Sequence, residues 1–370
     1  MKNPVIIPLA AALLSACTAA PQPAEPCDSR ATAETRALYA NMFRSAERGV
    51  MFGHQDDALY GHSWSYERGR SDVRECCDDY PAVFGWEIGC LELGAERSLD
   101  GVPFDEMVHL LCEASDRGAV NTVSWHVSNP QTGGSSWDCR TTSAVASVLP
   151  GGECHELYCV WLDRLAAFFG SLRHAGGEPA PVLFRPFHEH TSTGFWWGEA
   201  QCTPDEFRRL WRFTVEYLRD EKGIHNLLYV YSPDLFRDAE HYMERYPGDE
   251  WVDVLGMDAY HRPGEWDFIE GCRRMLSDLQ RLGREHRKPV AFTETGLEGV
   301  ADAEWWTGTL LPAIADFGLS YVLVWRNAHD RPSHFFGPWR GHASEEDFRR
   351  FASNSRQPIL FEGDLKDMYE

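Results

Sequence analysis

Two segments of the sequence carry the residue types that glycoside hydrolysis requires. The stretch 185–199, RPFHEHTSTGFWWGE, places Glu189 between two histidines and shortly before two tryptophans, and a second segment, FTETG, contains Glu294. Cleavage of a glycosidic bond needs one carboxylic acid to protonate the leaving oxygen, and one carboxylate to attack the anomeric carbon or to activate water. Glu189 and Glu294 are therefore the candidate catalytic pair. Taken singly, either glutamate is equally consistent with a helix cap or an ion-pair partner.

The side chains near Glu189 fit the same chemistry. Arg185 and His188 are predicted to orient its carboxyl group and to tune its pKa. Indole rings stack on the flat C–H faces of sugars, so Trp196 and Trp197 are candidate binding platforms. Any one tryptophan is also consistent with core packing, and a histidine with a buried structural role. Outside this segment, the candidates for sugar contacts are His126, Trp137, Tyr260, Trp325 and Trp339.

Other reaction classes lack their motifs. The chain has no GxSxG sequence, which marks the nucleophilic serine of α/β-hydrolases. It also has no pair of CxxC motifs and no cysteine–histidine spacing typical of zinc sites. We therefore expect no metal and no cofactor. The formal net charge of −22 argues against a nucleic-acid partner, because the phosphates would be repelled.

Eight short apolar runs are each followed by polar residues and then by a helical pattern. This alternation is typical of parallel strands connected by helices. Eight such units favour an α/β fold, the (β/α)8 or TIM barrel, with the active site at the carboxyl ends of the strands. The alternative is an open doubly wound sheet, but no glycine-rich phosphate loop follows the first run. The runs are VMFGHQ from Val50, VFGWEIG from Val83, VNTVSWH from Val120, VLFRPFHE from Val182, NLLYVYSP from Asn226, VDVLGMDAY from Val252, PVAFTETG from Pro289 and YVLVWRNA from Tyr321.

The N-terminus has the pattern of an exported lipoprotein. Lys2 precedes a short apolar run that ends in LSAC at Cys17, which is similar to a bacterial lipobox. We expect residues 1–16 to be a lipoprotein signal peptide and residues 17–35 to be the lipidated cysteine and a flexible tether. Residues 36–370 are expected to form one catalytic domain, anchored at the outer membrane, on the cell surface or in the periplasm. A plain secretory signal with an incidental cysteine is the alternative.

The cysteine count predicts disulfide bonds. The chain has 11 cysteines, and setting Cys17 aside leaves ten, an even number in a protein predicted to be exported. The sequence does not determine which cysteines pair. The candidates are Cys76, Cys77, Cys90, Cys112, Cys139, Cys154 and Cys159.

Several motifs together give the chain a resemblance to glycoside hydrolase family 26, whose main activity is endo-β-1,4-mannanase. They occur in the family's order and cover most of the chain after the predicted tether: FGHQ, SWH, FRPFHE followed by FWWG, GMDAY, FTETG and VWRNA. The resemblance implies a (β/α)8 barrel with glutamates after the fourth and seventh strands. It also implies a retaining mechanism in which Glu189 is the acid/base and Glu294 is the nucleophile.

The resemblance further implies which residues hold the sugar. His188 is expected to help hold the nucleophile or the substrate, and Tyr260 to hydrogen-bond near the nucleophile. Gly194 departs from the family, because many members carry a tryptophan there; this predicts a weaker aglycone platform unless Trp196 replaces it. The residues that fall where the family lines its glycone subsites are His126, Trp137, Asp258, Tyr260, Trp325 and Arg326.

The sequence thus predicts a monomeric, lipid-anchored, retaining endo-β-1,4-mannanase that cleaves mannan or galactomannan. Exo-release of mannobiose is one alternative, and action on β-1,3-xylan or mixed-linkage β-glucan within the same family is another. A surface lipoprotein that binds glycans without cleaving them is the alternative from a different class. The presence of both glutamates argues against that last alternative.

Overall fold

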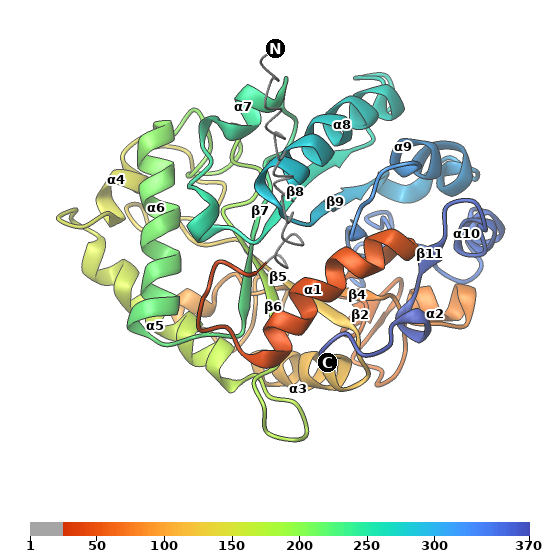
Figure 1. Cartoon of the computed structure of the whole chain (residues 1–370), viewed down its shortest axis with the longest axis horizontal. Coiled ribbons are helices and arrows are strands. Elements are labelled where there is room, and N and C mark those ends of the chain that lie inside the picture. Colours follow the sequence, from red (N-terminus) through yellow and green to blue (C-terminus); the bar gives the residue numbers. More distant parts are fainter. Residues whose placement is uncertain (1–24) are drawn as a thin grey trace, which may run out of the picture.

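The fold is a closed barrel of eight parallel strands (Figure 1). A computed structural model describes residues 25–370, and the predicted signal peptide and Cys17 lie outside this range. The barrel closes because β10 pairs with β9 on one side and with β1 on the other. Each strand lies within one of the eight predicted runs, which confirms the (β/α)8 barrel. The strands are β1 (Val50–Gln55), β4 (Val83–Glu87), β5 (Val120–Trp125), β6 (Val182–Pro186), β7 (Leu227–Tyr231), β8 (Val254–Tyr260), β9 (Val290–Gly296) and β10 (Tyr321–Val324).

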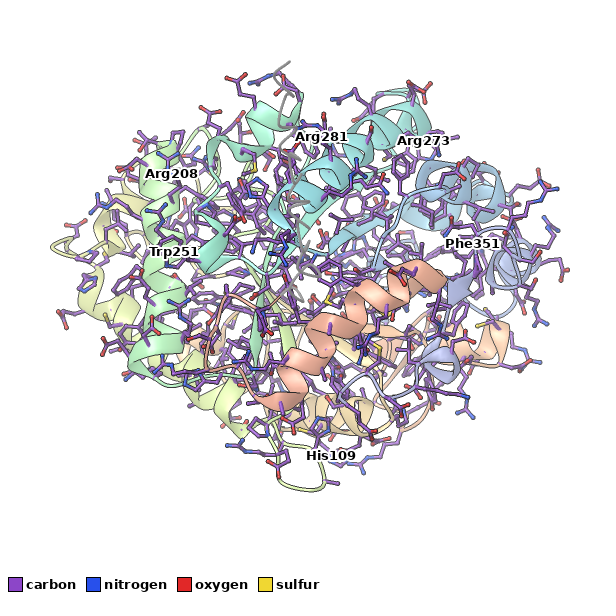
Figure 2. All side chains as sticks on the ribbon, in the orientation of Figure 1. His109, Arg208, Trp251, Arg273, Arg281 and Phe351 are labelled. Carbon is purple, nitrogen blue, oxygen red and sulfur yellow. The ribbon has the colours of Figure 1, made fainter. Side chains whose placement is uncertain are left out.

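Helices connect the strands and cover the outside of the barrel. Figure 2 shows the charged side chains of Arg208, Arg273 and Arg281 on the outer faces of two of these helices. Within residues 25–370, no helix has the length and apolar character needed to cross a membrane. The connecting helices are α2 (Asp72–Cys77), α3 (Phe104–Asp116), α4 (Ala144–Val148), α5 (His155–Ser171), α6 (Pro204–Glu216), α7 (Ala239–Glu244), α8 (Phe268–His286), α9 (Leu311–Ile314) and α10 (Glu345–Ala352). Three short strands lie beside the barrel or at its edge: β2 (Tyr60–Gly61), β3 (Trp64–Ser65) and β11 (Ile359–Leu360).

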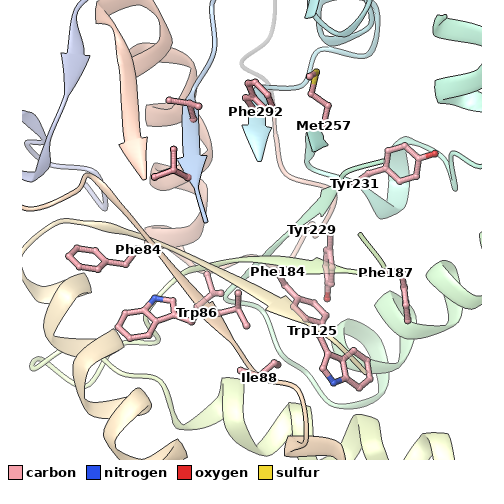
Figure 3. Close-up of a cluster of buried hydrophobic side chains, with 14 of the residues drawn as sticks. Phe84, Trp86, Ile88, Trp125, Phe184, Phe187, Tyr229, Tyr231, Met257 and Phe292 are labelled. Carbon is pink, nitrogen blue, oxygen red and sulfur yellow. The ribbon is translucent and has the colours of Figure 1, made fainter. Parts of the chain in front are cut away.

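Aromatic side chains fill the space between the strands and the helices. Figure 3 shows part of this layer, including Trp86 of β4, Trp125 of β5 and Phe184 of β6. The rings of Trp125 and Phe184 are 6.4 Å apart between centroids, and all three side chains are buried. Successive residues of a strand point to opposite faces, so the alternate residues point into the barrel. The inward-pointing apolar residues include Met51, Val83, Val120, Leu183, Leu228, Val254, Ala291 and Tyr321.

Helix α1 (Ala33–Arg48) closes the end of the barrel at which the strands begin. It crosses on the near side of the strands in Figure 1. Its side chains Leu38, Tyr39 and Met42 are buried and pack in the same cluster as the inward-pointing strand residues. The helix starts at a defined cap, because the Thr32 side chain accepts a hydrogen bond from a backbone N–H of the first turn. The barrel interior is therefore sealed at this end by an apolar plug.

The segment ahead of α1 is also packed against the barrel. The backbone N–H of Cys27 donates to the Asp253 carboxylate at 2.6 Å, and the Asp28 carboxylate lies 2.7 Å from the His225 ring. The predicted tether over residues 17–35 therefore ends earlier than expected, since fixed contacts begin by Cys27. Composition alone does not reveal these contacts, because their partners lie about two hundred residues further along the chain.

No disulfide bond is present within residues 25–370, where all ten cysteines are free thiols. The prediction of disulfides is therefore wrong. Several of the thiols contact backbone oxygens instead: Cys139 Sγ is 3.6 Å from the Thr193 carbonyl, and Cys154 Sγ is 3.5 Å from the Pro130 carbonyl. An even count in an exported chain permits pairing, but it does not place two sulfur atoms side by side.

Candidate active site

A β-bulge in β9 positions Glu294. Along the pairing with β8, Met257 lies opposite Phe292, whereas the next residue, Asp258, lies opposite Glu294. The register of the pairing between β9 and β10 shifts at the same place. Because a bulge adds one unpaired residue, two successive side chains, Thr293 and Glu294, point toward the barrel axis instead of alternating. The Thr293 hydroxyl donates to Asp258 at 2.6 Å, and the Glu294 carboxylate points toward Arg185 and Tyr260.

The Arg185 guanidinium joins two carboxylates below the cleft. It forms one ion pair with Asp258, at 2.7 Å, and another with Glu294. The other carboxylate oxygen of Glu294 accepts a hydrogen bond from the Tyr260 hydroxyl at 2.6 Å, as the resemblance implied. Burial lowers the pKa of Arg185, but the two carboxylates outweigh burial and raise it above its usual value. Both oxygens of Glu294 therefore face permanent donors, which suits an anionic nucleophile.

Glu189 follows β6 on a turn with unusual backbone geometry. Phe187 and Glu189 both adopt left-handed conformations, with φ of +50° and +52°. Such conformations are costly for residues with large side chains and persist where the surroundings fix them. Phe187 is buried in the aromatic layer, and the Glu189 N–H donates to the Ser232 carbonyl at 2.8 Å. The Glu189 carboxyl group itself makes no hydrogen bond within the described part of the chain, so it remains open to a ligand.

The surroundings of Glu189 favour its protonated form. Burial has the largest effect, and the negative charges of Glu294, Asp258 and Asp234 add to it, raising the pKa of Glu189 well above its usual value despite the opposing charge of Arg185. The two glutamates therefore have different surroundings: the Glu294 carboxylate accepts hydrogen bonds from two side chains, and the Glu189 carboxyl group accepts none within the described residues. A protonated acid facing a carboxylate is the combination that glycosidic cleavage requires.

Two histidines connect Glu87 to the region of the acid. The Glu87 carboxylate lies 2.7 Å from Nδ1 of His126, and Nε2 of His126 lies 3.2 Å from Nε2 of His188. Burial lowers the pKa of His126, but Glu87 outweighs this effect and raises it. Burial, aided by the charge of Arg185, lowers the pKa of His188 well below its usual value. The two Nε2 atoms share a hydrogen bond, and within the described residues His188 makes no hydrogen bond to Glu294.

A pocket of about 440 Å³ opens beside His126. Trp137, Trp325 and Arg326 line it. The Trp137 side chain is 54% exposed, so one face of its indole is available to a sugar ring. Arg326 forms a buried ion pair with Asp100 at 3.1 Å. The structure thus brings four of the predicted binding residues together, and it adds Asp100, which no sequence pattern singled out.

The two adjacent tryptophans of the GFWWG stretch are structural. Trp196 is fully buried and its indole N–H donates to the Val127 carbonyl at 2.9 Å. Trp197 is also fully buried, and its indole N–H donates to the His188 carbonyl at 2.8 Å. Neither ring can stack on a sugar, so the prediction that Trp196 binds substrate or replaces the missing aglycone tryptophan is wrong. The turn after β6 directs both indoles into the protein.

The Phe195 ring lies nearer to the His188 ring than the ring of either tryptophan does. Its ring stacks on Trp197 with centroids 4.6 Å apart and nearly parallel planes. The same ring lies 5.2 Å from the His188 ring and 6.0 Å from Trp137. Gly194, which precedes it, is exposed. Sequence reasoning missed Phe195, and the available signal was its place directly before the two tryptophans.

Arg185 and Asp258 also differ from their predicted roles. Arg185 was expected to orient Glu189 and to tune its pKa; its charge does oppose the rise in the pKa of Glu189 that burial causes, but its guanidinium contacts Glu294. Asp258 was expected to line a sugar subsite, yet it is fully buried and accepts hydrogen bonds from Arg185 and Thr293. Arg185 on β6 and Asp258 on β8 come from strands that are separated by β7, and their side chains meet inside the barrel. Asp258 therefore positions Arg185 and does not contact a ligand.

Comparison with known proteins agrees with this geometry. Residues 27–278, more than half of the chain, match the model of glycosyl hydrolase family 26. The chain belongs to this family. The membership inferred from the sequence motifs is thereby confirmed.

Solved structures and characterised sequences of the family are similar over most of the chain. A GH26 β-mannanase from Bacteroides ovatus is 45% identical, with a TM-score of 0.88 over 92% of this chain and 98% of that one. An endo-β-1,4-mannanase from Cellulomonas fimi is 34% identical, with a TM-score of 0.84 over 94% of this chain and 79% of that one. A mannan endo-1,4-β-mannosidase of Bifidobacterium adolescentis is 35% identical over 89% of this chain. The chain spans 35% of the length of that relative.

Proposed function

We propose that this family 26 protein is a retaining endo-β-1,4-mannanase acting on mannan and galactomannan. The observation that carries the proposal is the unequal environment of the two carboxyl groups in one cleft. Glu294 is held by Arg185 and Tyr260, whereas burial and nearby negative charge raise the pKa of Glu189. The names of relatives from several organisms, each called a mannanase or mannan endo-1,4-β-mannosidase, support the choice of substrate.

The reaction proceeds by double displacement. Glu294 attacks the anomeric carbon while Glu189 transfers its proton to the glycosidic oxygen, so that the C–O bond breaks and the leaving sugar departs neutral. A glycosyl ester of Glu294 remains. Glu189, now a carboxylate, accepts a proton from water as that water attacks the anomeric carbon, and Glu294 is released. Two inversions give net retention of configuration.

The charge network assists both steps. Before the first step, the anionic Glu294 raises the pKa of Glu189 and keeps it protonated. In the ester, Glu294 is neutral, so that repulsion disappears, the pKa of Glu189 falls, and Glu189 is stable as the carboxylate that the second step requires. Arg185 and Tyr260 hold the departing carboxylate again when the ester is hydrolysed.

A time course of products tests the substrate and the mode of attack. Linear mannan, galactomannan, β-1,3-xylan and mixed-linkage β-glucan are incubated with the protein, and products are separated by chromatography. We expect mixed manno-oligosaccharides early in the reaction. Mannobiose alone from the first time point would replace the endo mode by an exo mode. Product from only the xylan or the glucan would overturn the substrate.

Two variants separate the roles of the glutamates. Glu294→Ala and Glu189→Ala should each lower kcat/KM on mannan by at least about 10³-fold. Azide should restore turnover of an aryl mannobioside in both, with retention for Glu189→Ala and with inversion for Glu294→Ala, because azide then replaces water or the nucleophile respectively. Glu156→Ala, an exposed glutamate on α5, is the control. Near-normal activity of either catalytic variant would remove that residue from the mechanism.

We also propose that the protein is an exported, monomeric lipoprotein with its acyl chains on Cys17. The LSAC sequence and the short apolar run before it support this proposal. Labelling of a bacterial culture with tritiated palmitate should mark the wild-type chain and not the Cys17→Ala variant. Light scattering of the protein in detergent should give the mass of one chain.

A further inference from the structure

A second cavity lies at the end of the barrel opposite the active site. Its volume is about 600 Å³. It is bordered by the second half of α1, the end of α8, the first residue of β9 and the segment just before β10. Because all eight strands are parallel, their starting ends share one face of the barrel, and the catalytic residues lie at the other face. This cavity is therefore separate from the cleft.

The lining of this cavity is basic, although the chain as a whole has a net charge of −22. It contains Arg44, Arg284, Arg287 and Lys288 and no acidic residue, and we call these four residues and the cavity between them the basic cavity. Apolar groups such as Phe43 complete it. By contrast, a cavity of about 840 Å³ beside the start of α3 includes Glu96, Asp105 and Glu106 in its lining. The positive charge of this cavity is therefore a local feature, because the composition of the whole chain is acidic.

Two of these positive charges are not neutralised by a carboxylate. Arg44 donates to the amide oxygen of Asn41 at 2.8 Å, and neither Arg44 nor Arg284 forms an ion pair within residues 25–370. Both side chains are exposed. Lys288 is buried, and its ammonium donates to the backbone carbonyls of Asp249 and Val252. Burial raises the pKa of the Asp253 carboxyl group and the charge of Lys288 opposes this rise, so Lys288 is partly balanced by Asp253.

The nearest acidic residues at the rim are engaged elsewhere. Glu285 pairs with Arg281 at 2.9 Å, and Asp316 lies 3.6 Å from Arg273. Arg281 is exposed on α8, and Arg273 faces the carbonyls of Pro312 and Ala315. Glu47, on α1, does not line the cavity. The field in the cavity is therefore set mainly by Arg44 and Arg284, and it is attractive to an anion.

The chain enters the fold beside the basic cavity. Glu25 forms an ion pair with Arg36 of α1 at 2.7 Å, and Cys27 is bonded to Asp253, next to the Val252 carbonyl that Lys288 contacts. Cys17 precedes Glu25 by eight residues, a length that spans at most about 28 Å when fully extended. Any anchor at Cys17 would hold this end of the barrel near the surface to which it is attached.

We propose that the basic cavity binds phosphate groups of an anionic lipid surface, so that the starting end of the barrel faces the membrane. This proposal rests on one part of the proposed function, namely that the chain is exported and anchored at a membrane. A lipid surface fits because guanidinium groups without carboxylate partners lie next to apolar Phe43, and because the tether emerges at the same place. The active-site cleft then faces away from the membrane, toward polymeric substrate.

The test uses a chain that starts at Thr18, which lacks the signal and the acylation site but keeps every element of the closed barrel described above. It is mixed at low ionic strength with vesicles of phosphatidylethanolamine containing phosphatidylglycerol, and separately with pure phosphatidylcholine vesicles, and the bound fraction is measured by sedimentation. We expect binding to the phosphatidylglycerol vesicles only, and release as salt is added. Each basic residue near an anionic surface strengthens binding about fivefold.

The double variant Arg44→Glu/Arg284→Glu should weaken this binding at least about 25-fold. The matched control, Arg209→Glu/Arg340→Glu, changes net charge equally at exposed positions outside the basic cavity and should bind nearly as the wild type does. Both variants should retain the wild-type circular dichroism and kcat/KM. The proposal would be overturned if the control variant lost as much vesicle binding as Arg44→Glu/Arg284→Glu. It would also be overturned if binding of the wild type did not depend on salt, or if the wild type showed no preference for phosphatidylglycerol vesicles.

Discussion

The two ends of the barrel interior are filled by side chains of opposite chemistry. Where the strands end, Arg185, Asp258 and Glu294 form a buried ion network. In the turn after β6, Phe187 and Glu189 have left-handed backbone conformations. Where the strands begin, Leu38 and Met42 of α1 pack into an apolar layer.

The difference separates function from stability along one axis of the molecule. Buried ions gain little net stability, because the loss of hydration offsets their attraction. Their value lies in fixing the position and charge of Glu294 relative to Glu189. The apolar end gains stability from burial and contains no group that reacts. The fold therefore tolerates strain and charge at one end because the other end is well packed.

Removal of Arg185 is the strongest test of this division. Arg185→Met keeps the volume but leaves Asp258 and Glu294 without their shared cation. We expect kcat/KM to fall at least about 10³-fold and the free energy of unfolding to fall by about 3–5 kcal/mol. Kinetics on mannan and urea denaturation measure the two effects. The exposed Arg209→Met serves as control; an active and stable Arg185→Met protein would show that the ion network is dispensable.

Truncation at the other end should affect stability alone. Leu38→Ala leaves a cavity in the plug and should lower the free energy of unfolding by about 2–5 kcal/mol. Because α1 lies at the far end from the cleft, kcat/KM at 25 °C should remain that of the wild type. Urea denaturation and mannan kinetics check both statements, with the exposed Leu157→Ala as control. A loss of activity without unfolding would mean that the two ends are coupled.

The pH profile sharpens the comparison within the cleft. Burial raises the pKa of Asp234 to about 7, and its ionised form raises the pKa of Glu189. Activity requires protonated Glu189 and is lost as the pH rises through that pKa. Asp234→Asn removes a negative charge, lowers the pKa of Glu189, and should move the alkaline limb of kcat/KM to lower pH by up to about one unit. The exposed Asp205→Asn should leave the limb in place, and a shift to higher pH would contradict the assignment.

The smallest expected effect distinguishes an exposed tryptophan from a buried one. Trp137→Ala should raise KM for manno-oligosaccharides about threefold to tenfold, with little change in kcat, because one stacking contact is lost. Trp196→Phe should leave KM unchanged and lower the midpoint of thermal unfolding, since Trp196 is fully buried. Initial rates and thermal scans separate the two variants. If only Trp196→Phe changed KM, the pocket beside His126 would not be the sugar site.

Much of the architecture followed from local pattern. The eight strands fall inside the eight apolar runs, because continuous burial of a parallel strand is recorded in its own residues. The glutamates at the ends of β6 and β9 were found because their chemistry is unusual at such positions. The disulfides were predicted wrongly, since a cysteine count holds no information on distance between thiols. The function of Trp196 was also predicted wrongly, because the sequence does not say to which side a turn directs a ring.

The sequence by itself determined the barrel, its polar rim and the two glutamates, since strand periodicity and residue type are local properties. Only the tertiary structure decided the rest. The bulge in β9 depends on pairing with two other strands, and it brings Glu294 onto Arg185. The basic cavity depends on α1 meeting the end of α8, two segments more than two hundred residues apart. Contacts of this kind depend on register and packing across the whole barrel, which no single segment of the chain encodes.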